Sequence, residues 1–248
     1  MESLKVDAII QARCGSKRLP NKIFYELSEL PLIHHVVERL YPSKEINEII
    51  ISTTKSKSDD ILENWCLKND LKYYRGSENN VLKRYYQTAL KYNSDIIVRV
   101  TADDPFKDYR IIDNAIKIIK ERKLDYVTNN LPVSFPEGLD VEVMTFEALK
   151  KSFFNSISNY EKEHVTQYIQ RNQSYFKIFN IKNEIDLSNH RWTIDTIKDY
   201  NFVKEVYKHL YKSENIFMPE EIYSLLKSYP SLREINSNEK RSDLYNKL

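Results

Sequence analysis

Short apolar segments alternate with longer segments of helical periodicity through the first half of this 248-residue chain. The apolar segments are rich in β-branched residues, as strands are, and the periodic segments have the spacing of amphipathic helices. This alternation predicts an α/β fold, in which helices cover both faces of a mostly parallel sheet. The expected strands are residues 6–11, 49–53, 72–74 and 96–100, and the expected helices are 33–40, 61–69, 81–92 and 111–120.

The alternation becomes less regular beyond residue 125, although no repeat, low-complexity tract or linker divides the chain. We therefore predict a single domain over residues 1–230. The segment 231–248 has little apolar content, and we expect a polar C-terminal tail that drapes over the surface or frays. The further elements expected are strands over 141–144, 175–181 and 191–194, and helices over 146–154, 161–170, 199–210 and 219–228.

Composition excludes several classes of protein. The 38 basic residues nearly balance the 36 acidic ones, which disfavours a nucleic-acid partner. No apolar run approaches the roughly 18 residues that a membrane span needs, and the first residues do not resemble a signal peptide. Cys14 and Cys66 form no zinc or CxxC spacing, and no triad pattern surrounds Cys14 as a nucleophile. We expect a cytoplasmic protein with reduced thiols and no membrane partner.

The first expected strand, residues 6–11, leads directly into a loop rich in cations. An apolar helical segment follows, so this loop is expected to be the first strand-to-helix turn, and ligands of such sheets bind at the carboxyl ends of strands. Oriented backbone N–H groups, the hydroxyl of Ser16 and several cations in one small volume are what a triphosphate needs. The four cations are Arg13, Lys17, Arg18 and Lys22.

The two commonest nucleotide-binding motifs are absent from the sequence. No GxGxxG follows a strand, and no GxxxxGK[ST] occurs anywhere. Their absence argues against a Rossmann dehydrogenase and against a P-loop NTPase, although both are α/β proteins. The cationic loop therefore indicates a phosphate-binding α/β protein of a third kind.

Two aspartates follow expected strands that are far apart in the sequence. Asp103 follows the strand 96–100, and Asp195 follows the strand 191–194. Mg²⁺ typically takes one or two carboxylates together with phosphate oxygens and water. A metal ion on which two carboxylates converge would balance the charge of a triphosphate, so we predict Asp103 and Asp195 as ligands of Mg²⁺. The alternative is that Asp195 or Thr196 caps the following helix.

Acidic residues also mark an expected acceptor pocket. Asp140 and Glu142 alternate with apolar residues and share one face of a strand, and Glu163 and His164 follow on an expected helix. These four side chains are candidates for binding the hydroxyls of an acceptor. The alternative is that they are solvated acids on an edge strand and at a helix N-terminus.

The chain contains only three glycines, Gly15, Gly76 and Gly138. A composition that avoids glycine is expected to retain it where a side chain cannot be accommodated. The alternative is that they are ordinary turn glycines.

Five sequence blocks, in order, resemble the cytidylyltransferase superfamily that includes the CMP-Kdo and CMP-sialate synthetases. Within it, the chain is most similar to the branch of the spore coat polysaccharide biosynthesis protein F. The resemblance implies a three-layer α/β/α sandwich of the glycosyltransferase-A-like nucleotidyltransferase fold, with Mg²⁺, CTP, an acidic sugar as acceptor and a homodimer. The blocks are IIQARCGSKRLPNKI, RGSENNVLKRYYQTA, IVRVTADDPFKD, FPEGLDVEVMTFEAL with EKEHVTQYI, and RWTIDTIKDY.

The resemblance also implies roles for individual residues. Arg13, Ser16 and Lys22 would hold the triphosphate, and the segment 76–78 would read the base and ribose. The family's GDEP block is ADDP here, which keeps the metal-binding Asp103 but alters its neighbours. The catalytic set implied is Arg13, Lys22, Asp103 and Asp195. The nucleotide-binding set implied is Gln11, Ala12, Arg13, Gly15, Ser16, Lys17, Arg18, Lys22, Gly76, Ser77, Glu78, Thr101 and Asp103.

The mechanism expected is in-line attack of an acceptor oxygen on the α-phosphorus of a nucleoside triphosphate, which expels pyrophosphate. Arg13 and Lys22 would stabilise the charge that develops on the pyrophosphate. No residue stands out as general base, although His164 is a candidate. The nearest rival is a glycosyltransferase that holds a nucleotide sugar through Asp103, but four cations suit three phosphates better than two. A nucleotide-binding protein without turnover would lack a metal-binding acid, and both acids are present.

Overall fold

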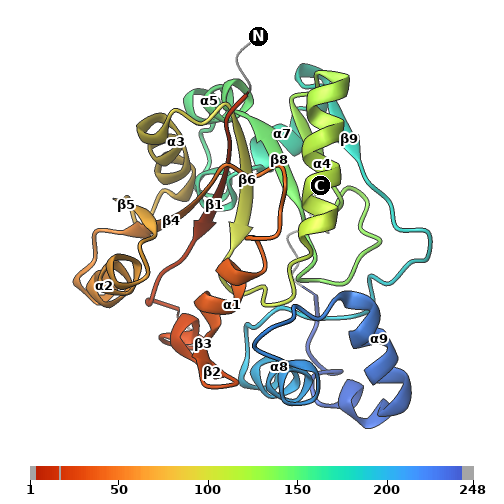
Figure 1. The fold of residues 1–248 in the computed structure, drawn as a ribbon. Helices are drawn as coiled ribbons and strands as arrows, with labels where there is room; N and C mark the ends of the chain where they lie inside the picture. Colours follow the sequence, from red (N-terminus) through yellow and green to blue (C-terminus); the bar gives the residue numbers. More distant parts are fainter. Residues whose placement is uncertain (1–3, 17, 242–248) are drawn as a thin grey trace.

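A computed structural model describes residues 4–16 and 18–241 (Figure 1). Its main sheet has seven strands in the order β5-β4-β1-β6-β8-β7-β9. Every pairing in this sheet is parallel except the two made by β8, so the sheet is mostly parallel. The strands are β1 (Val6–Gln11), β4 (Glu48–Thr54), β5 (Lys72–Gly76), β6 (Ile96–Thr101), β7 (Tyr126–Thr128), β8 (Glu142–Thr145) and β9 (Ile178–Asn180), with a separate hairpin of β2 (Glu26–Leu27) and β3 (Leu30–Pro31).

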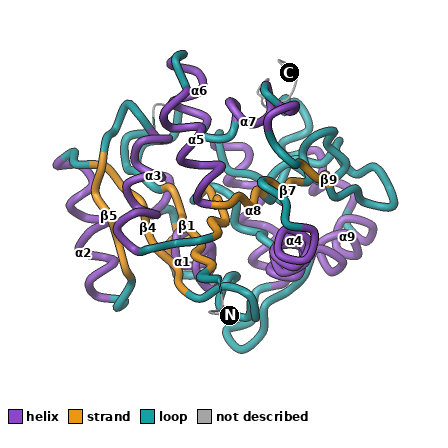
Figure 2. The backbone as a smooth tube through the Cα atoms, turned by 90° about the horizontal axis from the view of Figure 1, so that it is seen from above, coloured by secondary structure: helices purple, strands orange, loops and turns teal. Residues whose placement is uncertain are grey.

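Helices cover both faces of the sheet and complete the predicted three layers (Figure 2). On one face, α3, α5 and α7 pack on one apolar cluster; on the other, α1, α2 and α4 pack on a second cluster that continues to α8 and α9. The helices are α1 (Leu32–Glu38), α2 (Asp60–Lys68), α3 (Val81–Tyr92), α4 (Tyr109–Arg122), α5 (Phe146–Asn155), α6 (Asn159–His164), α7 (Gln167–Arg171), α8 (Ile197–Leu210) and α9 (Pro219–Ser228), with 3-10 turns η1 (Lys22–Phe24), η2 (Lys57–Asp59), η3 (Gln173–Tyr175) and η4 (Pro230–Glu234). Among the described residues, none of these helices has the length and apolar character to cross a bilayer.

The alternating direction of side chains along the central strands explains how each strand contributes residues to both apolar clusters. Successive strand side chains point to opposite faces. In β1, Ala8 and Ile10 therefore enter one cluster while Ile9 enters the other, and in β6 Val98 and Ile97 divide in the same way. Because β1, β4, β5 and β6 are parallel, their carboxyl ends meet at one edge of the sheet, where the cationic loop begins.

The second half of the fold departs from the sequence prediction in several places. The strand β7 was not expected, and of the strand expected over 175–181 only β9 (Ile178–Asn180) forms. The helix expected over 161–170 is divided into α6 and α7 at Val165, whose φ of 57° breaks the helical hydrogen-bond pattern. The strand expected over 191–194 does not join the sheet. Arg191 forms one isolated bridge with Glu137, and Ile194 N donates to the carbonyl oxygen of Asp103 at 2.9 Å. The segment makes only isolated backbone pairings with two loops, so no strand pairs with it along its length.

Gly138 permits this close approach. Its φ is +106°, and a Cβ atom at this position would lie 2.8 Å from the carbonyl carbon of Trp192. The expectation that glycine remains where a side chain cannot fit is confirmed here. It is wrong for Gly15, where the nearest atom to a Cβ would be 3.8 Å away, an ordinary contact.

We predict that Gly138→Ala lowers the free energy of unfolding by about 2 kcal/mol, because the new Cβ must displace backbone and the φ is strained for alanine. For a chain of this length the melting temperature would fall by about 5 °C. Thermal unfolding measures the effect, with Gly15→Ala as the matched control. Equal melting temperatures for the two variants would contradict the prediction.

Candidate active site

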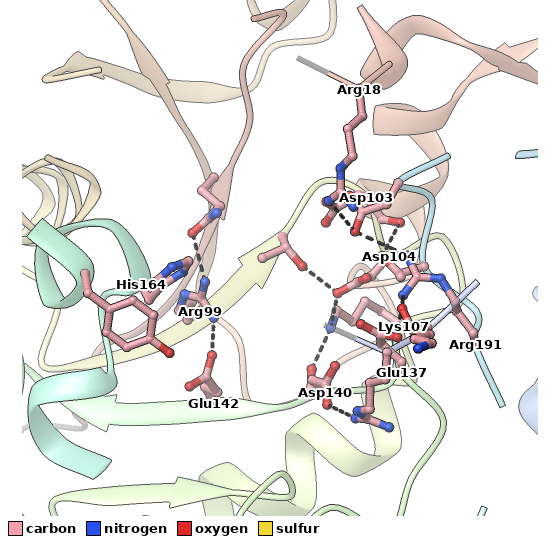
Figure 3. Close-up of a pocket in the computed structure, with 17 residues that line it drawn as sticks. Arg18, Arg99, Asp103, Asp104, Lys107, Glu137, Asp140, Glu142, His164 and Arg191 are labelled. Carbon is pink, nitrogen blue, oxygen red and sulfur yellow. Dashed lines mark hydrogen bonds and ion pairs between the residues drawn. The ribbon is translucent and has the colours of Figure 1, made fainter. Parts of the chain in front are cut away.

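A cleft with two lobes, a loop lobe and a tail lobe, opens at the carboxyl ends of β1 and β6; Figure 3 shows the tail lobe. The loop lobe, about 700 Å³, is lined mainly by the cationic loop and residues that follow β5. The tail lobe, about 670 Å³, is lined by β6, β8, the 137–140 loop and the C-terminal residues Lys240 and Arg241. Gln11, Arg18, Asp103 and Asp195 line both lobes, so these lobes are parts of one cleft.

The two aspartates predicted at strand ends, Asp103 and Asp195, bind the same lysine ammonium. Lys22 Nζ lies 2.8 Å from Oδ2 of Asp103 and 2.9 Å from Oδ1 of Asp195. The same ammonium donates to the carbonyl oxygen of Ile194 at 2.7 Å. Asp103 and Asp195 follow Lys22 by 81 and 173 positions in the sequence, and the Lys22 ammonium joins them at the boundary of the lobes.

Charge pairing controls ionisation in this cluster. Burial alone would lower the pKa of Lys22, but the charges of Asp103 and Asp195 outweigh it and raise that pKa. Burial would raise the pKa of Asp103, but the charge and hydrogen bond of Lys22 hold it below its usual value. The ammonium and the Asp103 carboxylate are therefore both charged at neutral pH.

Two arginines hold the other oxygen of Asp195. Arg18 Nη2 lies 2.9 Å and Arg191 Nη2 lies 3.3 Å from Oδ2 of Asp195. Arg191 also binds Glu137 at 2.6 Å and Asp199 at 2.9 Å, so it ties the 137–140 loop to the start of α8. Asp195 is not the helix cap: Thr196 caps α8 and forms a capping box with Asp199.

Asp103 and Asp195 are also the two residues predicted to bind a metal ion. The two oxygens that face Lys22 are hydrogen-bonded to its ammonium, and carboxylate oxygens are hard donors of the kind that Mg²⁺ prefers. Among the described residues there is no cluster of three or more His, Cys, Asp or Glu side chains that could hold a metal. Two carboxylates suit Mg²⁺ in their chemistry when phosphate and water supply its remaining ligands, and the magnesium site stays a prediction.

Most residues expected to bind the nucleotide line the loop lobe. They are Gln11, Ala12, Arg13, Gly15, Ser16, Arg18, Lys22, Glu78 and Asp103. Thr101 lines the tail lobe instead, where its hydroxyl donates to Asp104. Gly76 and Ser77 line neither the loop lobe nor the tail lobe, and the carbonyl oxygen of Ser77 accepts a 2.6 Å hydrogen bond from Arg84. Lys17 lies outside the described residues.

The four residues expected on the acceptor side divide between the lobes. Asp140, Glu142 and His164 line the tail lobe, whereas Glu163 lines the loop lobe. Glu142 is buried in a polar network, and Asp140 accepts a 3.2 Å hydrogen bond from Arg241. Both acids are therefore bound within the protein rather than solvated on an edge.

Several lining residues of the tail lobe were not predicted. They are Arg99, Asp104, Lys107, Glu137, Tyr160, Arg191, Thr193, Lys240 and Arg241. Arg99 carried a signal, since a cation within the apolar strand IIVRV has to be paired. The C-terminal residues carried none, because contacts such as Arg241 Nη1 to the carbonyl oxygens of Phe135 and Ser188, each 3.2 Å, join segments distant in sequence.

The end of the described part of the predicted tail, Lys240 and Arg241, thus lines the cleft, and the boundary at residue 230 stays a prediction. Cys14, within the cationic loop, is buried, and its N–H donates to Asp59 at 2.7 Å. Burial and the charge of Asp59 raise the pKa of its thiol to about 12. It is a neutral thiol at pH 7 and not a nucleophile.

A family model for cytidylyltransferases matches residues 8–247 of the sequence. The chain belongs to the cytidylyltransferase family. It is therefore a nucleotidyltransferase, and the rival glycosyltransferase assignment is not favoured. This cytidylyltransferase is 38% identical over 95% of its length to an uncharacterized protein of Methanocaldococcus jannaschii, 96% of which is covered. It is 31% identical to the spore coat polysaccharide biosynthesis protein SpsF of Bacillus subtilis, over 81% of this chain and 85% of that one.

Solved structures agree with this family. A cytidylyltransferase from Leptospira borgpetersenii is 34% identical, with a TM-score of 0.89 over 97% of this chain and 100% of that one. A CMP:2-keto-3-deoxy-manno-octonic acid synthetase complexed with CTP is 16% identical, with a TM-score of 0.63 over 82% of this cytidylyltransferase and 98% of that chain. The resemblance stated from the sequence and the predicted fold are both confirmed.

Proposed function

We propose that this enzyme transfers a cytidylyl group from CTP to an acidic sugar or phosphorylated metabolite for the synthesis of a surface polysaccharide, and that it releases pyrophosphate with the help of Mg²⁺. The observation that carries the proposal is the meeting of the cationic loop and the two strand-end aspartates at Lys22. The names of the relatives support CTP and a polysaccharide. The cytoplasmic location and the homodimer stay predictions.

In this proposal the loop lobe holds the triphosphate. Arg13, Ser16 and Lys22 line it, and Arg18 lines both lobes. Arg18 is 65% exposed at its side chain, so it can turn from Asp195 toward a phosphate. Cations placed before the reaction stabilise charge on the leaving pyrophosphate without reorganising in the transition state.

The tail lobe holds the acceptor beside the α-phosphate. Asp103 and Asp195 would hold Mg²⁺, which when bound supplies positive charge to the phosphates and lowers the pKa of a coordinated hydroxyl. Fixing the acceptor and the nucleotide in adjoining lobes converts a bimolecular step into an effectively unimolecular one. His164 lines the tail lobe and is the candidate for accepting the acceptor's proton.

A ligand screen followed by a product assay tests this proposal. We expect CTP with Mg²⁺ to stabilise the protein more than ATP, GTP or UTP, by about 2.7 kcal/mol at 100 times its dissociation constant. Incubation with CTP, Mg²⁺ and acidic sugars should then release pyrophosphate and form a CMP-linked product. A protein that responds equally to all four nucleotides, or that turns over a nucleotide sugar without releasing pyrophosphate, would contradict the proposal.

A further inference from the structure

Arg84, near the start of α3, carries a buried charge with no opposite charge beside it. The residue is only 2% exposed. Among the described residues no carboxylate forms an ion pair with it, and its Nε atom has no hydrogen-bond partner. Burial lowers the pKa of Arg84, but a guanidinium keeps its proton within a protein. A buried charge without an ion pair costs free energy, so its presence here calls for a specific role.

The guanidinium binds the loop that joins β5 to α3 (Figure 1). Its Nη1 donates to the carbonyl oxygen of Ser77 at 2.6 Å. Within the same loop, the N–H of Asn80 donates to Oγ of Ser77 at 3.1 Å, and Oδ1 of Asn80 accepts a 2.8 Å hydrogen bond from the N–H of Lys83. Arg84 therefore fixes the beginning of a loop whose end already caps α3.

Gly76 leaves the space that the Arg84 side chain occupies. A Cβ atom at position 76 would lie 2.9 Å from Cγ of Arg84 and 2.9 Å from Cε1 of Tyr74. The backbone of Gly76 is held in place, because its carbonyl oxygen accepts a 3.1 Å hydrogen bond from the N–H of Lys55. The expectation that glycine remains where a side chain cannot fit is thus confirmed at Gly76 as well.

The loop that Arg84 holds provides one wall of the loop lobe. Glu78, Asn79 and Val81 line this lobe, and we call these three residues the β5–α3 wall. Oε1 of Glu78 lies 4.0 Å from Nη1 of Arg13, so the wall adjoins the cationic loop. With the triphosphate on the cationic loop, the nucleoside is the part of CTP left to contact this wall. Hydrogen bonds to a base weaken steeply when their geometry is wrong, so the wall has to be held precisely.

We infer that Arg84 is the positioning residue for the β5–α3 wall: by binding the carbonyl oxygen of Ser77, it holds Glu78 and Asn79 where they meet the nucleoside. This inference rests on the proposed function and specifies which part of the site selects the base. Arg84 lines neither lobe, so it acts through the wall and not by touching CTP. The expected role of Gly76 and Ser77 is revised in the same way, since they support the wall rather than contact the nucleotide.

Binding of CTP, UTP and inorganic tripolyphosphate separates the wall from the cationic loop. All three ligands carry a triphosphate chain, but only the nucleotides can use the wall. Calorimetry with Mg²⁺ should show that the wild type binds CTP most tightly. We expect Arg84→Met, which removes the donor to Ser77, to weaken CTP binding about 10-fold and to change tripolyphosphate binding by less than about twofold. The preference for CTP over UTP should fall by a similar factor.

Three further variants separate positioning from charge and from general stability. Gly76→Ala leaves every charge in place but pushes against Arg84, so it should weaken CTP binding as Arg84→Met does. Because both changes act through one contact, the double variant should lose less than the two single losses combined. Arg84→Lys keeps a charged donor and should retain most of the preference for CTP. Arg39→Met is the control, because Arg39 is equally buried and binds two backbone carbonyl oxygens at 2.7 Å outside the loop lobe. It should lower the melting temperature and leave the affinities for all three ligands unchanged.

Thermal unfolding identifies the variants that are folded at the assay temperature, and Gly76→Ala carries the test if Arg84→Met is not. The inference is overturned if the wild type binds CTP no more tightly than tripolyphosphate, if Gly76→Ala binds CTP as the wild type does, or if its affinities for CTP and tripolyphosphate fall in parallel. Equal wild-type affinities for CTP and UTP would instead reject the proposed choice of CTP. In that case, weaker binding of both nucleotides by Gly76→Ala, with tripolyphosphate unchanged, would still support the positioning role of Arg84.

Discussion

Asp103→Asn is expected to lower the rate of pyrophosphate release by about 1000-fold while the protein stays folded. Asparagine has nearly the same volume, and its side-chain oxygen can still accept the hydrogen bond from Lys22. What it loses is the negative charge that would hold Mg²⁺ beside the α-phosphate. The effect should therefore appear in the turnover number, measured as pyrophosphate at saturating CTP and acceptor.

Asp113→Asn provides a control for this prediction. Asp113 accepts hydrogen bonds from the hydroxyl of Ser43 and, at 3.0 Å, from the N–H of Lys44, at a place remote from the cleft lining. The control should retain turnover, and both variants should melt within a few degrees of the wild type. Normal pyrophosphate release by Asp103→Asn would remove Asp103 from the metal site.

The first half of the fold could be predicted because its information is local. Each central strand divides its side chains between two cores, so the strand has its own apolar signal, as Ile9 and Ile10 illustrate. The three-residue strand β7 is too short for such a signal. The reversed direction of β8 depends on its partners and not on its sequence. The break at Val165 was also hidden, because valine gives no sign of a positive φ.

The candidate site shows the same difference between features with a local sequence signal and features that depend on distant partners. Strand ends could be read from the sequence, so Gln11 and Asp103 were placed correctly at the edge where ligands bind. Asp195 was placed near them although the expected strand before it is wrong, because a few backbone hydrogen bonds to neighbouring loops hold the segment in place. The walls formed by Arg191 and Arg241 depend on long-range pairing that no local pattern encodes.

The Lys22 cluster, formed by Lys22, Asp103 and Asp195, keeps the free energy of unfolding of the wild-type protein steady over a broad range of pH. Asp103 has a depressed pKa in the folded state, so its contribution is present above the unfolded value and is lost as the pH falls through the folded one. Lys22 has a raised pKa, so its contribution is present below the unfolded value and is lost as the pH rises through the folded one. Between these limits the cluster adds no slope to the stability curve.

Lys22→Met should reverse this behaviour on the acid side. It leaves Asp103 and Asp195 facing each other without the ammonium, so burial and repulsion would raise the pKa of one carboxyl above its unfolded value. The folded state then binds more protons than the unfolded state, and stability should rise as the pH falls from 7.5 toward 5.5, by about 2 kcal/mol at most. Urea unfolding at the two pH values measures this slope, and Lys120→Met, which breaks the 2.7 Å pair with Glu45 outside the cleft, is the control. Loss of a phosphate-binding cation should also lower kcat/KM for CTP by about 100-fold or more. A pH slope identical to that of the wild type would show that Lys22 does not neutralise the two aspartates, and the arrangement on which the proposed chemistry depends would have to be abandoned.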